Sequence, residues 1–189
     1  MLQLLRGLRG LAIVCLALFF AGCAMQSPPY SPSIDHVQLI KDKTRQAAKL
    51  GEFSVQAGAK NATSIGIRAS SMSSNVGGDD AQYLAQALRS ELEMAQRLDP
   101  KANIEITGVL LGTDIDTGMS EGTGYIQARF VVKNNGAIRF DKVKRGDFKW
   151  ESSFVGAIAI PAAQQAYPSV VKELLGALYG DDDFQQALQ

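Results

Sequence analysis

Alternating apolar and polar positions in the middle of the chain predict a series of β-strands. Residues 53–57 and 64–71 (SIGIRASS) alternate and contain β-branched side chains, so we interpret them as two strands. Alternation resumes at 103–111, where Gly108 would fit a bulge, and again at 125–133 (YIQARFVVK). This part of the chain is therefore expected to form a sheet.

The predicted strands are separated by segments with the composition of turns. Asn135-Gly136 is a two-residue sequence favoured in hairpin turns that need positive φ, and it leads into a strand at 137–141. A further strand is expected at 146–150. We interpret the Gly- and Asp-rich run 112–124 as a loop.

Helical spacing of apolar residues marks two longer segments. The first begins at Asp79 or Asp80, either of which can cap a helix, and ends before Asp99-Pro100. Its apolar stripe consists of Ala81, Leu84, Ala85, Leu88, Leu92 and Ala95. The second runs from 163 to 178 across Pro168, which is expected to kink or restart the helix.

Three other segments complete the pattern. Residues 35–50 are mixed and allow an irregular helix, and 184–188 allow a final turn. The apolar stretch 154–163 is too short to cross a bilayer, so we interpret it as buried protein. The order of elements predicts an α+β fold: a two-layer sandwich of mostly antiparallel sheet, with two long helices on one face. The other sheet face is left to solvent, the N-terminal segment or a partner.

The N-terminus has the organisation of a secretory signal. Arg6 and Arg9 precede an apolar stretch from Leu11 to Ala21 and then small residues. This stretch is shorter than the roughly 20 apolar residues that a membrane-spanning helix needs. We therefore expect residues 1–22 to be a signal peptide.

Phe20, Ala21, Gly22 and Cys23 resemble the lipobox of bacterial lipoproteins. The resemblance implies cleavage between Gly22 and Cys23 and acyl chains on Cys23, which together make a stable membrane anchor. In that family Asp after the cysteine favours the inner membrane, so Ala24 implies the outer membrane, facing the periplasm. An ordinary cleaved signal, or one that stays in the membrane, is the alternative.

The remainder is expected to be a short tether followed by one domain. Residues 23–34 hold the lipidated cysteine and a Pro/Ser-rich run, interpreted as an extended tether, and 35–189 form a single α+β periplasmic domain. Removal of Arg6 and Arg9 leaves 17 basic residues against 19 acidic ones, a formal net charge of −2. Nucleic acid is therefore not expected as a partner.

Residues for catalysis or metal binding are scarce. Cys15 leaves with the signal and Cys23 is used for lipid, so no thiol remains. His36 is the single histidine and is expected to be solvated, which argues against a zinc site or a Cys-His pair. We expect no cofactor, no metal and no enzymatic activity.

Asp114, Asp116 and Glu121 are the candidate site residues of the predicted 112–124 loop. Asp114 and Asp116 begin like a calcium loop, but the twelfth position is Tyr125, where such a loop needs a bidentate acid. We interpret the loop as solvated and as a possible partner-binding loop.

The stretches RFVVKNNGAIRFDK and WESSFVGAIAIPAAQQAYP, with the lipobox, resemble small proteobacterial envelope lipoproteins. The similarity is to the YajG type and to the α+β domain shared by LpoB and the N-terminal domain of TolB. It implies an accessory protein of the cell envelope and assigns no site residues.

Three functions are compatible with the sequence. The first is a non-enzymatic adaptor, anchored by Cys23, that binds another envelope protein through its sheet face, a sheet edge or the 114–124 part of the loop. The second is an auxiliary lipoprotein of a lipid or solute transporter, which predicts an enclosed apolar cavity. The third is a hydrolase using Asp114 and Asp116, which requires the two acids to face one another in a cleft.

Overall fold

The computed structural model describes residues 24–61 and 63–189, so the predicted signal peptide, Gly22 and Cys23 lie outside the described residues. Its main sheet has four strands in the order β2 (Ala48–Lys60), β5 (Ile104–Asp116), β6 (Glu121–Asn134) and β7 (Ala137–Glu151). β2 and β5 are parallel, and the other two pairings are antiparallel. A smaller sheet joins β1 (Ala24–Gln26), β4 (Ser70–Ser73) and β3 (Ile65–Ile67) in that order.

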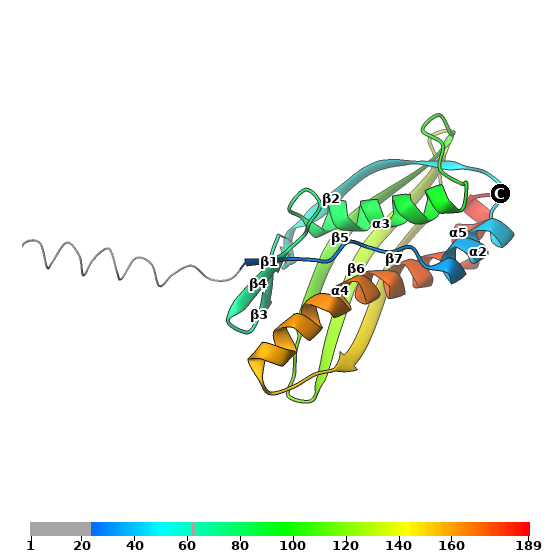
Figure 1. The fold of residues 1–189 in the computed structure, drawn as a ribbon. Helices are drawn as coiled ribbons and strands as arrows, with labels where there is room; N and C mark the ends of the chain where they lie inside the picture. The colour runs from blue at the N-terminus through cyan, green and yellow to red at the C-terminus, as the bar shows by residue number, and fades with distance from the viewer. Residues whose placement is uncertain (1–23, 62) are drawn as a thin grey trace, which may run out of the picture.

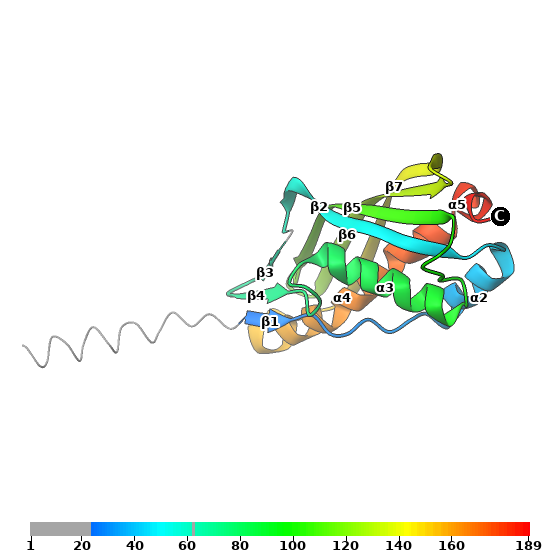
Figure 2. The ribbon, with the colours of Figure 1, turned by 90° about the horizontal axis from the view of Figure 1, so that it is seen from above.

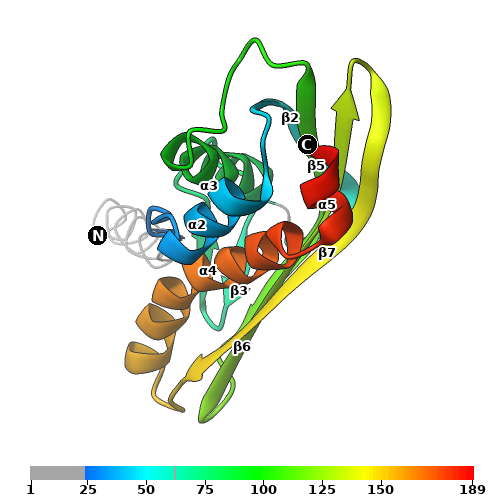
Figure 3. The same ribbon diagram turned by 90° about the vertical axis from the view of Figure 1, so that its right-hand side faces the viewer.

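The helices lie on one face of the main sheet (Figures 1 and 3). They are α2 (Ile34–Lys43), α3 (Asp80–Met94), α4 (Gly156–Tyr179) and α5 (Asp182–Ala187). α3 packs against β2 and β5, and α4 packs against β6 and β7. The predicted α+β sandwich, with both long helices on one face, is confirmed.

The core lies between these two layers. Inward residues of β5 and β6 alternate with outward ones, and Ile106, Ala128 and Phe130 are fully buried against the helices. Phe53 of β2 covers Gly108, where any side chain would overlap its ring. Gly108 pairs in register with Phe130, so the bulge is not at this residue as predicted. Irregularities lie between Leu50 and Phe53 of β2 and between Leu110 and Gly112 of β5.

The strands are longer than their sequence patterns indicated. Most of the predicted 112–124 loop belongs to β5 and β6, and only 117–120 connects them. Gly122 and Gly124 lie inside β6. Only glycine fits at these positions, because Trp150 and Val170 occupy the space that a side chain would need. The two strands predicted at 137–141 and 146–150 form one strand, β7, whereas 64–71 divides between β3 and β4.

α4 begins earlier than the sequence pattern indicated and does not restart at Pro168. It is one helix through Pro161 and Pro168, with its inner face packed against the sheet. The expected burial of 154–163 is wrong for Phe154, Val155 and Ile158, whose side chains are exposed. Ala159 and Ala163 are the buried positions of that stretch.

The closest approach of α4 to β7 supplies a test of the packing. A Cβ added at Gly146 would overlap the backbone nitrogen of Leu174, which cannot rotate away. Gly146→Ala is expected to lower the free energy of unfolding by about 1–3 kcal/mol, measured by urea denaturation. Gly66→Ala is the control, since a Cβ there meets nothing within 4 Å. Equal stability of the two variants would contradict this packing.

Candidate functional site

The segment that follows the predicted anchor is bound to the domain. We call residues 24–33 the strap. Its first part, β1, pairs with β4, and the Gln26 carbonyl accepts a 2.7 Å hydrogen bond from Gln164 Nε2 of α4. Further along, the Pro28 carbonyl accepts a 2.8 Å bond from the Tyr83 hydroxyl of α3. The strap is extended, as its prolines predicted, but it lies along the helical layer instead of projecting as a spacer (Figure 2).

A buried carboxylate fastens the end of the strap. Glu91 of α3 has no exposed surface and accepts hydrogen bonds from the Tyr30 hydroxyl at 2.7 Å and the Ser33 amide at 2.9 Å. His36 Nδ1 of α2 lies 3.2 Å from the same carboxylate oxygen. The expectation that His36 is solvated is wrong: its side chain is 15 % exposed, because it packs between this carboxylate and the ring of Tyr179.

These contacts keep Glu91 ionised. Burial alone raises the pKa of a carboxyl group, but the hydrogen bonds from His36, Ser33 and Tyr30 outweigh it and leave the pKa of Glu91 below its ordinary value. Burial also raises the pKa of Tyr30, and the Glu91 charge raises it further, so this hydroxyl stays a donor. The Glu91 cluster is therefore a polar clamp inside an apolar layer.

A second buried acid lies on the same helix. Asp80 is 2 % exposed and belongs to the first turn of α3. Burial raises the pKa of Asp80 to about 6; the Tyr167 hydroxyl lowers it in part, and the neighbouring charge of Asp79 raises it. Strongly shifted acids are often functional, but Asp80 and Glu91 are both covered by protein and are not accessible to a substrate.

Sequence reasoning considered Asp80 only as a helix cap and missed that Asp80 and Glu91 are buried, although a signal was present. Asp80 and Glu91 are eleven residues apart, which is about three helical turns, so both share the face of α3 that buries Leu84 and Leu88. A charged residue within an apolar stripe predicts a buried partner. The tyrosine and histidine that supply it could not be identified without the path of the strap.

The structure does not gather the predicted site residues into one constellation. Asp114 pairs with Lys60 at 2.6 Å, Glu121 pairs with Lys149 at 2.8 Å, and Asp116 accepts from the Gly118 amide. Within 24–61 and 63–189, no group of three His, Cys, Asp or Glu side chains is placed to hold a metal ion. Asp114, Asp116 and Glu121 lie at strand ends, so the partner-binding loop shrinks to residues 117–120.

The sheet face opposite the helices carries a network of ion pairs. Four pairs join neighbouring strands: Lys49 to Glu105, Lys60 to Asp114, Arg129 to Asp141, and Lys149 to Glu121. Arg145 and Asp147 form a further pair within β7. The Arg145 guanidinium also lies 4.0 Å from the centre of the Tyr125 ring. A partner covering this face would have to desolvate these charges, so the open face is the weaker binding surface.

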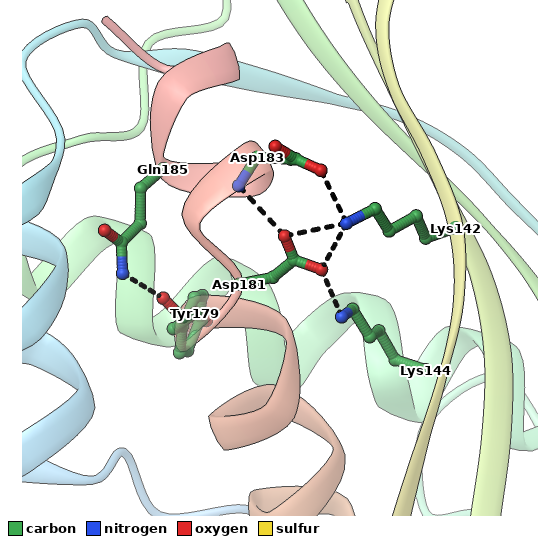
Figure 4. Close-up of polar contacts among 6 residues, drawn as sticks. All are labelled: Lys142, Lys144, Tyr179, Asp181, Asp183 and Gln185. Carbon is green, nitrogen blue, oxygen red and sulfur yellow. Dashed lines mark hydrogen bonds and ion pairs between the residues drawn. The ribbon is translucent and has the colours of Figure 1, made fainter.

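β7 forms an edge of the main sheet and is fixed to the helical layer at one end. Lys142 and Lys144 of β7 both reach Asp181, which follows α4, and Lys142 also contacts Asp183 at 2.6 Å (Figure 4). Burial raises the pKa of Asp181, but hydrogen bonds from Lys144 and Lys142 outweigh it and lower the pKa to about 2. The cluster therefore ties the Lys142–Lys144 part of β7 to the segment that follows α4.

The concavities of the described surface are open to solvent. One of about 470 Å³ lies beside β7 and α5 and is lined by residues such as Arg139, Asp141, Lys142 and Asp183. The space between helices and sheet is instead occupied by large buried side chains, among them Tyr83, Phe130 and Tyr167. Among the helices of residues 24–61 and 63–189, none combines the length and apolar character needed to cross a membrane.

Comparison with known proteins supports the fold. No family model and no curated protein matches the chain. Among solved structures, it is similar to protein XCC0632 from Xanthomonas campestris, of the DUF330 family, with a TM-score of 0.52 and 12 % identity over 87 % of this chain and 98 % of that one. At this identity the likeness extends to the fold alone.

A second solved structure is more distant. The hypothetical protein CT253 from Chlamydia trachomatis gives a TM-score of 0.35 at 9 % identity, over 70 % of this chain and 98 % of that one, and it carries no argument. Both similar structures are bacterial proteins. Neither is a named member of the YajG, LpoB or TolB type, so that part of the resemblance stays a prediction.

The clamp predicts an effect on the strap that depends on pH. Glu91→Gln removes the charge that accepts from Tyr30 and Ser33, and is expected to cost about 1–3 kcal/mol of stability at pH 7. Hydrogen exchange of residues 26–33 should rise. Since the folded pKa of Glu91 is lowered, its contribution is present above the ordinary value of 4.5 and is lost as the pH falls below it, so the variants should converge in acid. Glu93→Gln, on the exposed face of α3, is the control.

Asp80 predicts the opposite pH dependence. Its folded pKa of about 6 exceeds the ordinary 3.8, so the wild type loses stability as the pH rises from 3.8 to about 6. Asp80→Asn is therefore expected to be more stable at pH 7, by at most about 3 kcal/mol, and equal to the wild type near pH 3.5. Urea denaturation at several pH values measures this. Parallel pH profiles of the two proteins would contradict the raised pKa.

Proposed function

We propose that the protein is a periplasmic lipoprotein anchored to the outer membrane through Cys23, and that it binds another protein of the cell envelope without catalysing a reaction. The observation that carries the proposal is the strap. Ala24 belongs to a strand paired with β4, so a lipid on the preceding residue would hold the folded domain directly at the membrane. Such a position suits an accessory protein with a fixed orientation.

The chemistry of the described residues supports binding over catalysis. The His36 ring is hydrogen-bonded to Glu91. Of the two acids that the hydrolase hypothesis requires, Asp114 pairs with Lys60 and Asp116 accepts from the Gly118 amide. A Ser or carboxylate nucleophile would need an accessible base within hydrogen-bond reach. We therefore retain the non-enzymatic proposal.

The edge of β7 is the surface that we propose for the protein partner. It is the last strand in the sheet order, and its backbone groups on that side meet no further described strand. Edge strands recruit extended segments by adding a strand to the sheet. The lysines of β7 are each paired with an acid of the same chain, and the strand also carries Asp141, Asp147 and Glu151, so its charges oppose indiscriminate pairing without selecting a partner of one sign.

The transporter alternative requires a cavity for an apolar ligand. The tight packing of Tyr83, Phe130 and Tyr167 between the layers does not favour it. If the protein instead binds a transporter through protein contacts, without holding a ligand, that role is included in the adaptor function proposed above.

Lipid attachment is tested by replacing the cysteine. Cys23→Ala is expected to shift the protein from the membrane fraction to the soluble periplasmic fraction and to abolish incorporation of labelled palmitate. The Glu93→Gln variant, with Cys23 intact, is the control. Unchanged sedimentation of Cys23→Ala with membranes would contradict the anchor.

The partner surface is tested by crosslinking in the lipidated protein. A photoreactive residue at Val143 of β7 should give an adduct with one envelope protein, whereas the same group at Met94 should not. The two side chains are comparably exposed, at 48 % and 45 %, so accessibility is matched. Equal adducts from both positions, or none from Val143, would refute edge binding.

A further inference from the structure

A group of exposed apolar side chains lies where α4 begins and β5 turns into β6. Eight large apolar side chains are exposed in the described ranges, and four of them belong to this end of the molecule. They are Met119, Phe154, Val155 and Ile158, exposed by 73 %, 71 %, 39 % and 59 %. We call these four residues the apolar rim.

The first half of α4 is unusual for a surface helix. No residue from 152 to 171 is charged, although Ala157, Ile158 and Pro161 are exposed. Surface helices normally carry charged residues on their outer face and a polar residue at the N-cap. Here the N-cap is Val155, without a side-chain hydrogen bond. The outer face therefore has the composition of a surface in contact with an apolar neighbour.

Arg68 holds the rim in a defined shape. From the turn between β3 and β4, its guanidinium donates to Thr117 Oγ1 and to the carbonyls of Gly118, Ser153 and Phe154, each at 2.8 Å. These bonds connect the β5–β6 turn to the segment before α4. The rim is thus assembled before any partner arrives, which lowers the entropic cost of contact.

Polar groups border the rim. Asp116 accepts from the Gly118 amide, Glu121 pairs with Lys149, and Glu151 is exposed. With Arg68, both signs of charge are present, so the border suits the zwitterionic headgroups of phosphatidylethanolamine. An apolar centre with a charged border is the arrangement of proteins that rest in the interface of a bilayer.

The rim lies at the end of the molecule from which the chain leads to Cys23. β1 pairs with β4, next to the turn that carries Arg68, and Figures 1 and 2 both place β1 at the end where α4 begins. Ala24, the first residue of β1, follows Cys23 in the sequence, so a lipid attached to Cys23 would anchor the domain through β1. We infer that the apolar rim inserts into the lipid surface beside the anchor and that the domain stands on this end. The inference depends on the proposed lipid attachment.

The test uses the full lipidated chain in vesicles of phosphatidylethanolamine with a minor fraction of phosphatidylglycerol. Since Cys23 is acylated, Ile158→Cys provides a single thiol for an environment-sensitive fluorophore. Ile138→Cys is the control, because Ile138 is 60 % exposed and lies in β7 beside the β6–β7 turn, roughly 40 Å along the strands from the β5–β6 turn. Emission is recorded with and without lipids that carry a nitroxide near the headgroup.

The fluorescence emission of the label at position 158 is expected to shift to shorter wavelength in the presence of vesicles. Nitroxide lipids should quench it several-fold more than the emission of the label at position 138. Equal quenching at both positions, in vesicles that still carry the protein on flotation, would overturn membrane contact while leaving the anchor intact. Shielding of position 158 only after addition of an envelope protein would assign the rim to a protein and also overturn it. Failure of the protein to float, with Cys23 bare by mass spectrometry, would instead refute the anchor, and with it this inference.

Discussion

Packing of two helices against one face of the sheet is the constraint on which the other features depend. α4 approaches β7 so closely that only glycine fits at position 146, and α3 presents its apolar face to β2 and β5. The strap contacts both helices, through Tyr83 and Gln164, and therefore has a binding surface only when both are in place. Docking of the N-terminal segment is thus a consequence of the helical layer.

The two buried acids show how polar groups are used inside that layer. Glu91 is surrounded by donors from the strap and from α2, so its charge contributes to assembly. Asp80 has less compensation, as its raised pKa indicates. The pair illustrates that burial alone does not decide the ionisation state of a carboxyl group; the number of hydrogen-bond donors does.

The sequence predicted the fold class because periodicity reports which face of an element is buried. The stripe of α3, its cap at Asp79 and the Asn135-Gly136 hairpin are all local features, and all three are present. The errors arose where residues distant in the sequence determine the local structure. Gly122 and Gly124 resembled a loop because the bulk of Trp150 and Val170 is invisible to a local pattern.

Candidate site residues were harder to predict than elements. Asp114, Asp116 and Glu121 are neighbours in the chain, yet each is satisfied by a different residue of the folded protein. His36 and Glu91 are 55 positions apart in the sequence. They meet because the strap runs along α3 from Tyr83 to Glu91 and places α2 beside Glu91. A short sequence pattern can indicate a group of charged side chains, but it cannot indicate which distant side chains pair with them.

The docked strap also limits how far the domain could search for a partner. A flexible segment of ten residues has an end-to-end distance of roughly 15–20 Å, and an anchored domain could move over that distance from its anchor. With residues 24–33 bound to α3, α4 and β4, that freedom is removed, and a lipid on Cys23 would leave the domain to diffuse only laterally at one height. Any partner would therefore have to present its own binding segment at that height above the bilayer.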